Sequence, residues 1–243
     1  MPVRVLIIRF SSIGDIVLTT PVIRCVKQQL NEGDVEVHYL TKKQFIPLLQ
    51  ENPYIDELIT IENKVAEVAD TLRNNGYDYV FDLHKNLRSG QAKKAAGALS
   101  FSFEKLNIEK WVYVNFKVNR MPDVHIVDRY MATTKAFGVK NDGKGLDYLI
   151  PKCDEIPLGH LPVTHHNGYV AYAIGGQHPG KILPDEKIIE LCVLLDRPIV
   201  LLGGREDELR GKHIAHEVGE SVFNAAGMFY LNQSASLLRQ ADV

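Results

Sequence analysis

The chain alternates short, mostly apolar runs with longer segments whose apolar residues recur every three or four positions. Runs of the first kind, such as Val3–Ile8, predict parallel strands buried on both faces. Segments of the second kind predict amphipathic helices, and strands alternating with helices of this length indicate βαβ units on parallel sheets. The predicted strands are 3–8, 35–40, 58–61, 77–83, 169–174 and 199–202, and the predicted helices are 15–30, 44–50, 64–74, 87–98, 125–137, 184–195, 206–218 and one that starts at 235.

The pattern divides the chain in two. Residues 151–167 contain Pro151, Pro157 and Pro162 among polar residues, which predicts a linker between a first domain, 1–150, and a second unit, 168–243. A complete doubly wound domain usually needs about 100–150 residues. The second unit is shorter, so we expect an incomplete sheet with an apolar edge that is prone to association.

Composition narrows the class of protein. With 243 residues, 45% hydrophobic, 24% charged and a net charge of −2, the chain has an ordinary globular composition and no overall attraction for nucleic acid. Three widely spaced cysteines, Cys25, Cys153 and Cys192, form no CxxC pair and indicate reduced thiols, as in a cytoplasmic protein. We find no secretory signal and no apolar segment of membrane-spanning length.

The turn after the first predicted strand, residues 9–21, is the first candidate site. Ser12 and Asp15 have the spacing of a capping box before a helix, with Gly14 between them to allow a tight turn. Alternatively, Asp15 faces the crevice beyond the strand ends and accepts a proton from a substrate hydroxyl. Spacing alone favours the cap. Hydroxyls and free N–H groups at such a helix start also suit a phosphate or a sugar.

A glycine-rich segment, residues 175–182, follows the strand predicted at 169–174. It matches G-x-x-x-x-G-K, but Ile182 stands where a P-loop needs Ser or Thr for Mg²⁺, and Pro179 lacks an N–H. A P-loop NTPase is therefore disfavoured. The alternatives are a looser phosphate site, with Gly176 amides and Lys181 as a point charge, or a glycine-rich turn with a solvated lysine.

Basic residues gather after the strand predicted at 77–83. His84, Lys85 and Arg88 come just past its carboxyl end and suit an anion-binding rim, although such runs are usually solvated helix faces. Arg129 belongs to a similar polar group at the start of the helix predicted at 125–137, which helix capping explains equally well. The histidines show no metal-binding spacing, so no metal or other cofactor is expected.

These segments together resemble glycosyltransferase family 9, the lipopolysaccharide heptosyltransferases. The similarity lies in a series of segments in the family's order along the whole chain: Arg9–Asp15 with Thr20 and Pro21, 82–89, 125–130, Gly175 and Gly176 with Lys181 and Pro184, 201–206, and 224–227.

The resemblance implies a GT-B fold, α/β with two Rossmann-like domains, the first binding the acceptor and the second the nucleotide sugar. It also implies inverting transfer of heptose from ADP-heptose to the anionic inner core of lipopolysaccharide, at the inner face of the inner membrane. Asp15 would be the general base. Ser12, Gly14, Gly176, Lys181 and Glu206 would bind the donor, and Lys85, Arg88 and Arg129 the acceptor.

The chain departs from the family pattern in one respect. The family's donor-binding D-T-G-x-x-H segment is absent, so we expect an incomplete donor site and impaired activity. Two alternatives remain at this stage. One is a non-catalytic protein that binds a nucleotide or sugar phosphate and uses Asp15 only as a cap. The other is a related glycosyltransferase that uses another nucleotide sugar.

Overall fold

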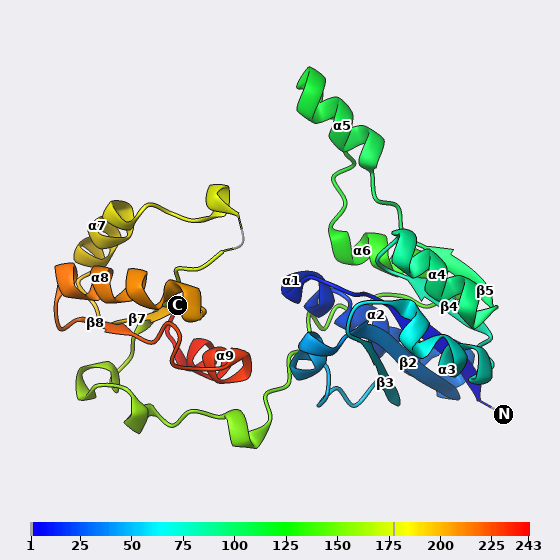
Figure 1. The fold of residues 1–243 in the computed structure, drawn as a ribbon, viewed down its shortest axis with the longest axis horizontal. Helices are drawn as coiled ribbons and strands as arrows, with labels where there is room; N and C mark the ends of the chain where they lie inside the picture. Colours follow the sequence, from blue (N-terminus) through cyan, green and yellow to red (C-terminus); the bar gives the residue numbers. More distant parts are fainter. Residues whose placement is uncertain (1, 177) are drawn as a thin grey trace. The chain divides into compact units, whose positions relative to one another are not determined.

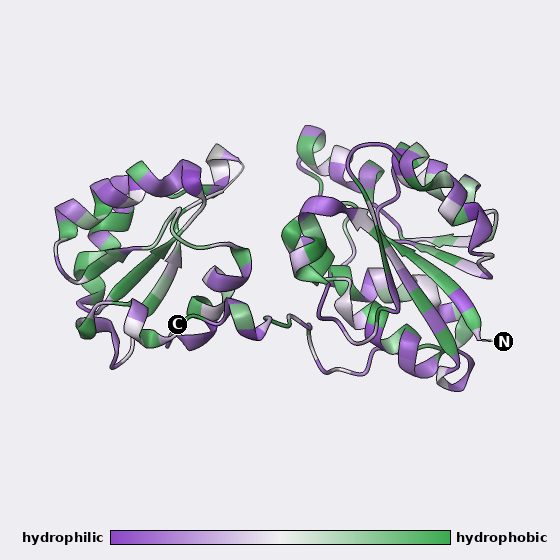
Figure 2. Ribbon diagram, turned by 60° about the horizontal axis from the view of Figure 1, so that its bottom comes forward, coloured by the Kyte–Doolittle hydropathy of each residue, from purple (hydrophilic) through white to green (hydrophobic). Residues whose placement is uncertain are grey.

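The computed structural model describes residues 2–176 and 178–243, so Gln177 of the glycine-rich segment lies outside the described residues. The chain divides into two compact units, residues 1–149 and 150–243, and each has its own parallel sheet. Both sheets are built from the apolar runs of the sequence, which Figure 2 shows as hydrophobic strands beneath helices with polar outer faces. The predicted α/β class with parallel sheets is confirmed.

The first unit holds a five-stranded sheet in the order β3-β2-β1-β4-β5. Helices cover both of its faces: α2 and α6 pack with one apolar cluster, and α3 and α4 with the other. The strands are β1 (Val3–Ile8), β2 (Val35–Lys42), β3 (Glu57–Ile61), β4 (Tyr79–Asp82) and β5 (Leu99–Ser102), and the helices are α1 (Ile13–Val17), α2 (Thr20–Gln29), α3 (Ala69–Asn74), α4 (Leu87–Ala96), α5 (Asn107–Phe116) and α6 (Ile126–Met131).

Three local expectations for the first unit are corrected. The single helix expected at 15–30 is divided into α1 and α2, because Pro21 stands at the start of α2 and has no N–H to continue a helix from before it. The helix expected at 44–50 is a 3₁₀ segment, Lys43–Leu48, which contains Pro47. The helix expected at 125–137 ends as α6 at Met131 and continues as a 3₁₀ segment.

Arg24, on α2, binds the last segment of the first unit, residues 142–147. Its side chain is 2% exposed, and it donates to both carboxylate oxygens of Asp142 at 2.8 Å, to Asp147, and to the carbonyl of Gly145 at 2.9 Å. The hydrogen bond to Asp142 is the main reason why the pKa of Arg24 is raised, and the same bond lowers the pKa of Asp142. The pair therefore stays ionised, and residues 142–147 are held on the body of the unit.

The second unit has a three-stranded parallel sheet in the order β6-β7-β8. The segment expected to be a linker, residues 151–167, packs on this unit: Ile156 and Leu161 are buried in its core, and His165 lies within hydrogen-bonding distance, 3.1 Å, of the Ile199 carbonyl. The strands are β6 (Val170–Ala173), β7 (Ile199–Leu202) and β8 (Val222–Asn224), and the helices are α7 (Asp185–Leu195), α8 (Glu208–Val218) and α9 (Leu231–Gln240).

Candidate functional site

The turn between β1 and α1 holds Asp15 as a helix-capping residue. Ser12 precedes the helix, and its backbone N–H and its hydroxyl both donate to Oδ2 of Asp15, at 3.3 and 3.0 Å. Gly14 is a residue of α1, and its backbone is not in the left-handed conformation that favours glycine. A Cβ at this position would meet nothing within 4 Å. The turn therefore has the Asp15 half of the predicted capping box, whereas the Ser12 side chain makes no cap hydrogen bond to the helix backbone. Its backbone does not require a glycine.

Arg9 connects this turn to the neighbouring strand end. Its guanidinium donates to the carbonyls of Ser11 and Leu83, both at 2.6 Å, and lies 2.7 Å from Oδ2 of Asp15. The guanidinium also stacks over the ring of Tyr130, 5.7 Å from its centroid. Because Leu83 follows β4, one buried cation holds the carboxyl ends of β1 and β4 together. Spacing along the sequence does not reveal this role of Arg9, because Leu83 and Tyr130 are far from it in the chain.

The Asp15 carboxylate is held by one oxygen only. Oδ2 makes the contacts with Ser12 and Arg9, whereas Oδ1 has no hydrogen-bond partner among the described residues. Partial burial opposes ionisation, but the charge of Arg9 and the hydrogen bonds from Ser12 outweigh it and lower the pKa of Asp15. The side chain is 39% exposed. An ionised carboxylate with one fixed and one free oxygen is compatible with both capping and proton acceptance.

The loop after β4 is built around the buried carboxylate of Asp82. Its Oδ1 accepts the backbone N–H groups of His84 and Lys85, at 3.0 and 2.7 Å, and its Oδ2 accepts the hydroxyl of Ser89 at 2.8 Å and lies 3.2 Å from Nζ of Lys93. These contacts hold the loop at the switch point of the sheet, between β1 and β4, where open α/β sheets bind ligands.

The predicted basic residues of this loop lie beside the Asp15 turn. Lys85 is exposed, and Arg88 is half-buried with its guanidinium 5.6 Å from the centroid of the Phe10 ring. Phe10 directly follows Arg9, and His84 meets the edge of the same ring at 5.5 Å. The structure thus brings Lys85 and Arg88 to the same end of the sheet as Asp15.

His84 is not a cation at neutral pH. Burial, followed by the positive charges of Arg9 and Lys105, lowers its pKa to about 4. Its Nδ1 is buried and has no hydrogen-bond partner among the described residues. His84 is therefore neutral at this end of the sheet, and the expectation that it contributes to a positively charged anion-binding rim is corrected.

Arg129, on α6, lies over a different aromatic ring. Its guanidinium is 5.8 Å from the centroid of Phe103 and donates to the carbonyl of Glu104, while its Nε is buried without a partner among the described residues. Arg129 lines a hollow with residues 100–104 of β5 and the loop after it. Neither Lys85 nor Arg88 lines that hollow, so the structure does not place Arg129 with them there.

In the second unit, the predicted donor residues follow the carboxyl ends of adjacent parallel strands. Gly176 and Lys181 come after β6, and Glu206 comes after β7. The side chains of Lys181 and Glu206 are exposed, and no described residue pairs with either. A Cβ on Gly176 would lie 3.3 Å from the side chain of Ile182, so the loop 175–182 folds closely on itself.

Two residues without a predicted role fix these loops. Asp207 is buried, accepts the N–H of Gly204 at 2.9 Å, and lies so close to Gly175 that a Cβ there would be 2.2 Å from its carboxylate. Arg210 donates to the carbonyl of Ile174 at 2.6 Å, to the carbonyl of Leu183 and to Asp185. Asp207 therefore joins the loops after β6 and β7, and Arg210 closes the glycine-rich loop at both ends.

Sequence comparison places the chain near one group of enzymes. No family model matches the chain. Lipopolysaccharide heptosyltransferase 1 of Campylobacter coli is 24% identical over 211 residues, which are 79% of this chain and 60% of that protein. The chain thus spans less than two thirds of the length of this relative.

Solved structures share the fold across nearly the whole chain. A glycosyltransferase of family 9 from Veillonella parvula matches 99% of this chain and 73% of its own, with a TM-score of 0.79 and 20% identity. The predicted resemblance to glycosyltransferase family 9 is confirmed. Heptosyltransferase WaaC of Escherichia coli, solved with ADP, matches 98% of this chain and 78% of its own, with a TM-score of 0.70 and 21% identity. These two structural matches confirm the predicted GT-B fold. None of the described helices is long and apolar enough to cross a membrane.

Proposed function

We propose that this protein is a glycosyltransferase of lipopolysaccharide core synthesis, which moves a heptose from ADP-heptose to an anionic sugar of the inner core with inversion. The observation that carries the proposal is the ionised Asp15 carboxylate, with one oxygen fixed by Arg9 and Ser12 and the other free, at the switch point of the first sheet. The heptosyltransferase relatives supply the reaction class.

The proposed reaction is one displacement at the anomeric carbon. Asp15 accepts the proton of the acceptor hydroxyl while the hydroxyl oxygen forms a bond to that carbon. The bond from the anomeric carbon to the ADP phosphate oxygen breaks on the opposite face, and ADP leaves with the electron pair. The lowered pKa of Asp15 keeps it ionised at neutral pH, so it is ready to take a proton when the hydroxyl becomes acidic in the transition state.

Individual cations lie at the positions proposed for the two anionic ligands. Lys85 and Arg88 suit an anionic acceptor, and Arg129 is an additional candidate for the same role. On the donor side, the Gly176 amide and the Lys181 ammonium, which pairs with no described residue, suit the diphosphate, and exposed Glu206 suits the hydroxyls of the nucleotide ribose. Ser12 and Gly14 are proposed at the donor's sugar, where Gly14 leaves open space.

A transfer assay with the Asp15→Asn variant tests the base. Asn keeps a side-chain oxygen for the capping bonds but cannot take up a proton, so we expect transfer to fall by about 10²–10⁴-fold with ADP affinity unchanged. Asp70→Asn is the matched control, because it makes the same exchange at an exposed carboxylate of α3 that pairs only with Arg73 among the described residues. Transfer by Asp15→Asn at the wild-type rate would favour the second candidate, a non-catalytic protein in which Asp15 only caps α1.

Calorimetric titration with ADP, UDP and GDP tests the donor. We expect ADP to bind most tightly and Lys181→Ala to weaken it at least about tenfold, since an ammonium–phosphate contact contributes about 1.5–3 kcal/mol. Lys187→Ala on α7 is the control, because Lys187 is exposed and paired with Glu190. Tighter binding of UDP or GDP would instead identify a related glycosyltransferase with another nucleotide sugar.

A further inference from the structure

The segment 105–124, here called the arm, leaves the body of the first unit and returns to it. Its helix α5 stands away from the sheet (Figure 1), and none of the ten residues of α5 is buried. Leu106 and Lys117, which flank the helix, both have left-handed backbones. The arm is therefore a separate projection with a bend at each end of its helix, and it does not contribute to the core of the unit.

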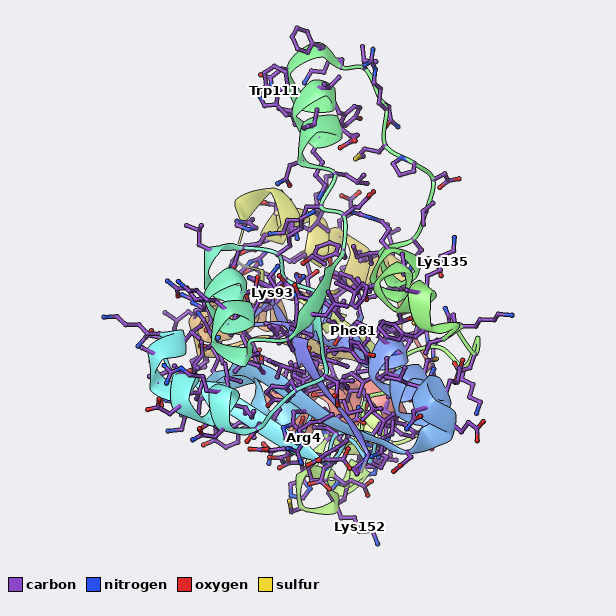
Figure 3. All side chains as sticks on the ribbon, turned by 90° about the vertical axis from the view of Figure 1, so that its right-hand side faces the viewer. Arg4, Phe81, Lys93, Trp111, Lys135 and Lys152 are labelled. Carbon is purple, nitrogen blue, oxygen red and sulfur yellow. The ribbon has the colours of Figure 1, made fainter. Side chains whose placement is uncertain are left out.

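The surface of the arm is apolar where that of a free helix should be polar. Its exposed apolar side chains are Ile108 (76%), Trp111 (58%), Tyr113 (45%), Val114 (64%), Phe116 (63%), Val118 (47%), Met121 (37%) and Val124 (48%). Trp111 lies at the far end of the first unit from its sheet (Figure 3), and its ring meets that of Phe116 edge to face, 5.5 Å between centroids. So many exposed apolar side chains in one short segment mark a binding site for protein or membrane.

The distribution of these side chains around α5 favours a lipid surface. At about 100° per residue, Tyr113 and Val114 lie about 140° and about 120° away from Ile108 around the helix axis. A groove in a partner protein covers one stripe of a helix, whereas a helix that is apolar on most sides suits a hydrocarbon boundary. Tryptophan and tyrosine are the side chains that gather at membrane interfaces.

Charge points to anionic headgroups. The arm carries four basic residues, Lys105, Lys110, Lys117 and Arg120, against the two acidic residues Glu109 and Asp123. A net positive, aromatic segment is attracted to an anionic bilayer, whereas two copies of the arm repel each other. A second copy of this chain is thus the less suitable occupant.

The base of the arm is fixed next to the candidate acceptor residues. Arg129 binds the carbonyl of Glu104, immediately before the arm, and α6 begins at Ile126, immediately after it. Lys105, the first residue of the arm, lies close enough to Arg9 for their like charges to lower its pKa, an effect second only to burial. The arm is therefore attached to the first unit beside Arg9 and Arg129.

We propose that the arm, residues 105–124, inserts its apolar side chains into the interface of an anionic membrane and so brings the first unit to a membrane-anchored acceptor. The choice of acceptor rests on the proposed function, but insertion of the arm does not. The arm is a positioning element, because none of its residues is assigned to the reacting groups.

Trp111 gives a direct assay, because it is the only tryptophan in the chain. With vesicles of phosphatidylethanolamine and phosphatidylglycerol, we expect its emission to move to shorter wavelength and to be shielded from iodide. Vesicles of phosphatidylcholine alone should bind at least about tenfold more weakly, since each basic residue near an anionic surface contributes about 1 kcal/mol. No emission change with the anionic vesicles would overturn the proposal.

Co-sedimentation of variants with the same vesicles separates the arm from other exposed apolar residues. Ile108→Ser with Phe116→Ser keeps the Trp111 reporter and should reduce binding at least tenfold. Val193→Ser with Leu194→Ser, on exposed positions of α7, is the matched control and should bind as wild type. Equal loss in both double variants would overturn the proposal. An emission change that grows with protein concentration in the absence of vesicles would also overturn it, in favour of a second copy.

Transfer to two acceptors distinguishes this proposal from the proposed function. The arm variant should transfer to a deacylated, water-soluble core acceptor at the wild-type rate and should lose transfer only to the acceptor embedded in vesicles. If the wild type transfers to neither acceptor, the proposed function fails and vesicle binding still tests the arm. Equal loss of transfer to both acceptors, with vesicle binding intact, would overturn the arm's role.

Discussion

Replacing Arg9 by methionine tests whether this buried guanidinium controls the ionisation of Asp15. Methionine fills a similar length without charge. The side chain is 9% exposed and is surrounded by the carbonyls of Ser11 and Leu83, the carboxylate of Asp15 and the ring of Tyr130. The substitution therefore removes one cation and three polar contacts with little loss of volume.

The structure gives the size of two separate effects. Charges about 4 Å apart attract by about 4 kcal/mol at an effective dielectric constant of about 20. Because Asp15 is 39% exposed, we discount this to about 1 kcal/mol of preference for its ionised form. The buried carbonyl of Leu83 loses a charged donor, at a cost of about 1–3 kcal/mol, whereas the carbonyl of Ser11 is only partly buried and can bind water instead. We therefore expect Arg9→Met to lower the free energy of unfolding by about 2–4 kcal/mol.

The assay is the pH dependence of kcat/KM for transfer, with urea unfolding measured in parallel. Without the guanidinium the pKa of Asp15 rises, so more of the carboxylate is protonated in mildly acidic solution. The acid limb of the profile, where kcat/KM falls at low pH, therefore moves to higher pH. Arg9→Lys is the control: it keeps the charge but not the planar fork, so it should lose stability while the limb stays in place. An acid limb in Arg9→Met that overlays the wild-type limb would refute the reasoning.

Three further predictions concern stability. The pKa of His84 is lowered to about 4, so below pH 6.5 the unfolded chain takes up a proton first. Stability should fall by roughly 1–2 kcal/mol between pH 6.5 and pH 4 after discounting for partial exposure, and His84→Gln should flatten that fall in urea titrations. Gly14→Ala should raise stability in thermal melts by about 0.5–1 kcal/mol, because its Cβ meets nothing; a loss would show hidden strain. Gly175→Ala should destabilise the second unit by about 1–3 kcal/mol, because its Cβ would lie 2.2 Å from Asp207; unchanged denaturant midpoints would contradict this.

Local patterns in the sequence predict the strands and the first turn well. Val3–Ile8 is apolar except for Arg4 and becomes the central strand β1. The spacing of Ser12 and Asp15 predicts the hydrogen bond from the Ser12 N–H to Asp15 that the structure contains. Periodicity does not reveal where a helix is interrupted. At Pro21 the missing N–H divides one apolar pattern into two helices.

The sequence predicts no helix or strand in residues 100–124, for a physical reason. Strand β5 has four residues, too few for a periodic signal, and its pairing with β4 is a tertiary contact. Helix α5 is apolar on most of its sides. It therefore lacks the pattern of one apolar and one polar face by which a surface helix is recognised in a sequence. Its aromatic residues are visible in the sequence, but their exposure is not.

The residues that hold the loops of the candidate site in place do so through contacts between positions far apart in the sequence. Arg9 binds Leu83 across 74 residues, and Arg210 binds Ile174 across 36. Asp207 stands beside Glu206 in the sequence, yet only the structure shows that one is buried against Gly175 while the other is exposed. Residue type and spacing can propose which groups meet a ligand, but they do not identify the groups that hold those residues in place.

The attachment of Arg24 has a consequence for folding during synthesis. All pairings of the first sheet lie within residues 3–102, so the strands can associate early as the chain leaves the ribosome. Arg24, however, is buried with Asp142, Gly145 and Asp147, which are made about 120 residues later. Until they emerge, this guanidinium has no counter-charge and opposes the docking of α2. The last of these partners stands just before Leu149, so the first unit completes its packing only when its own sequence is complete.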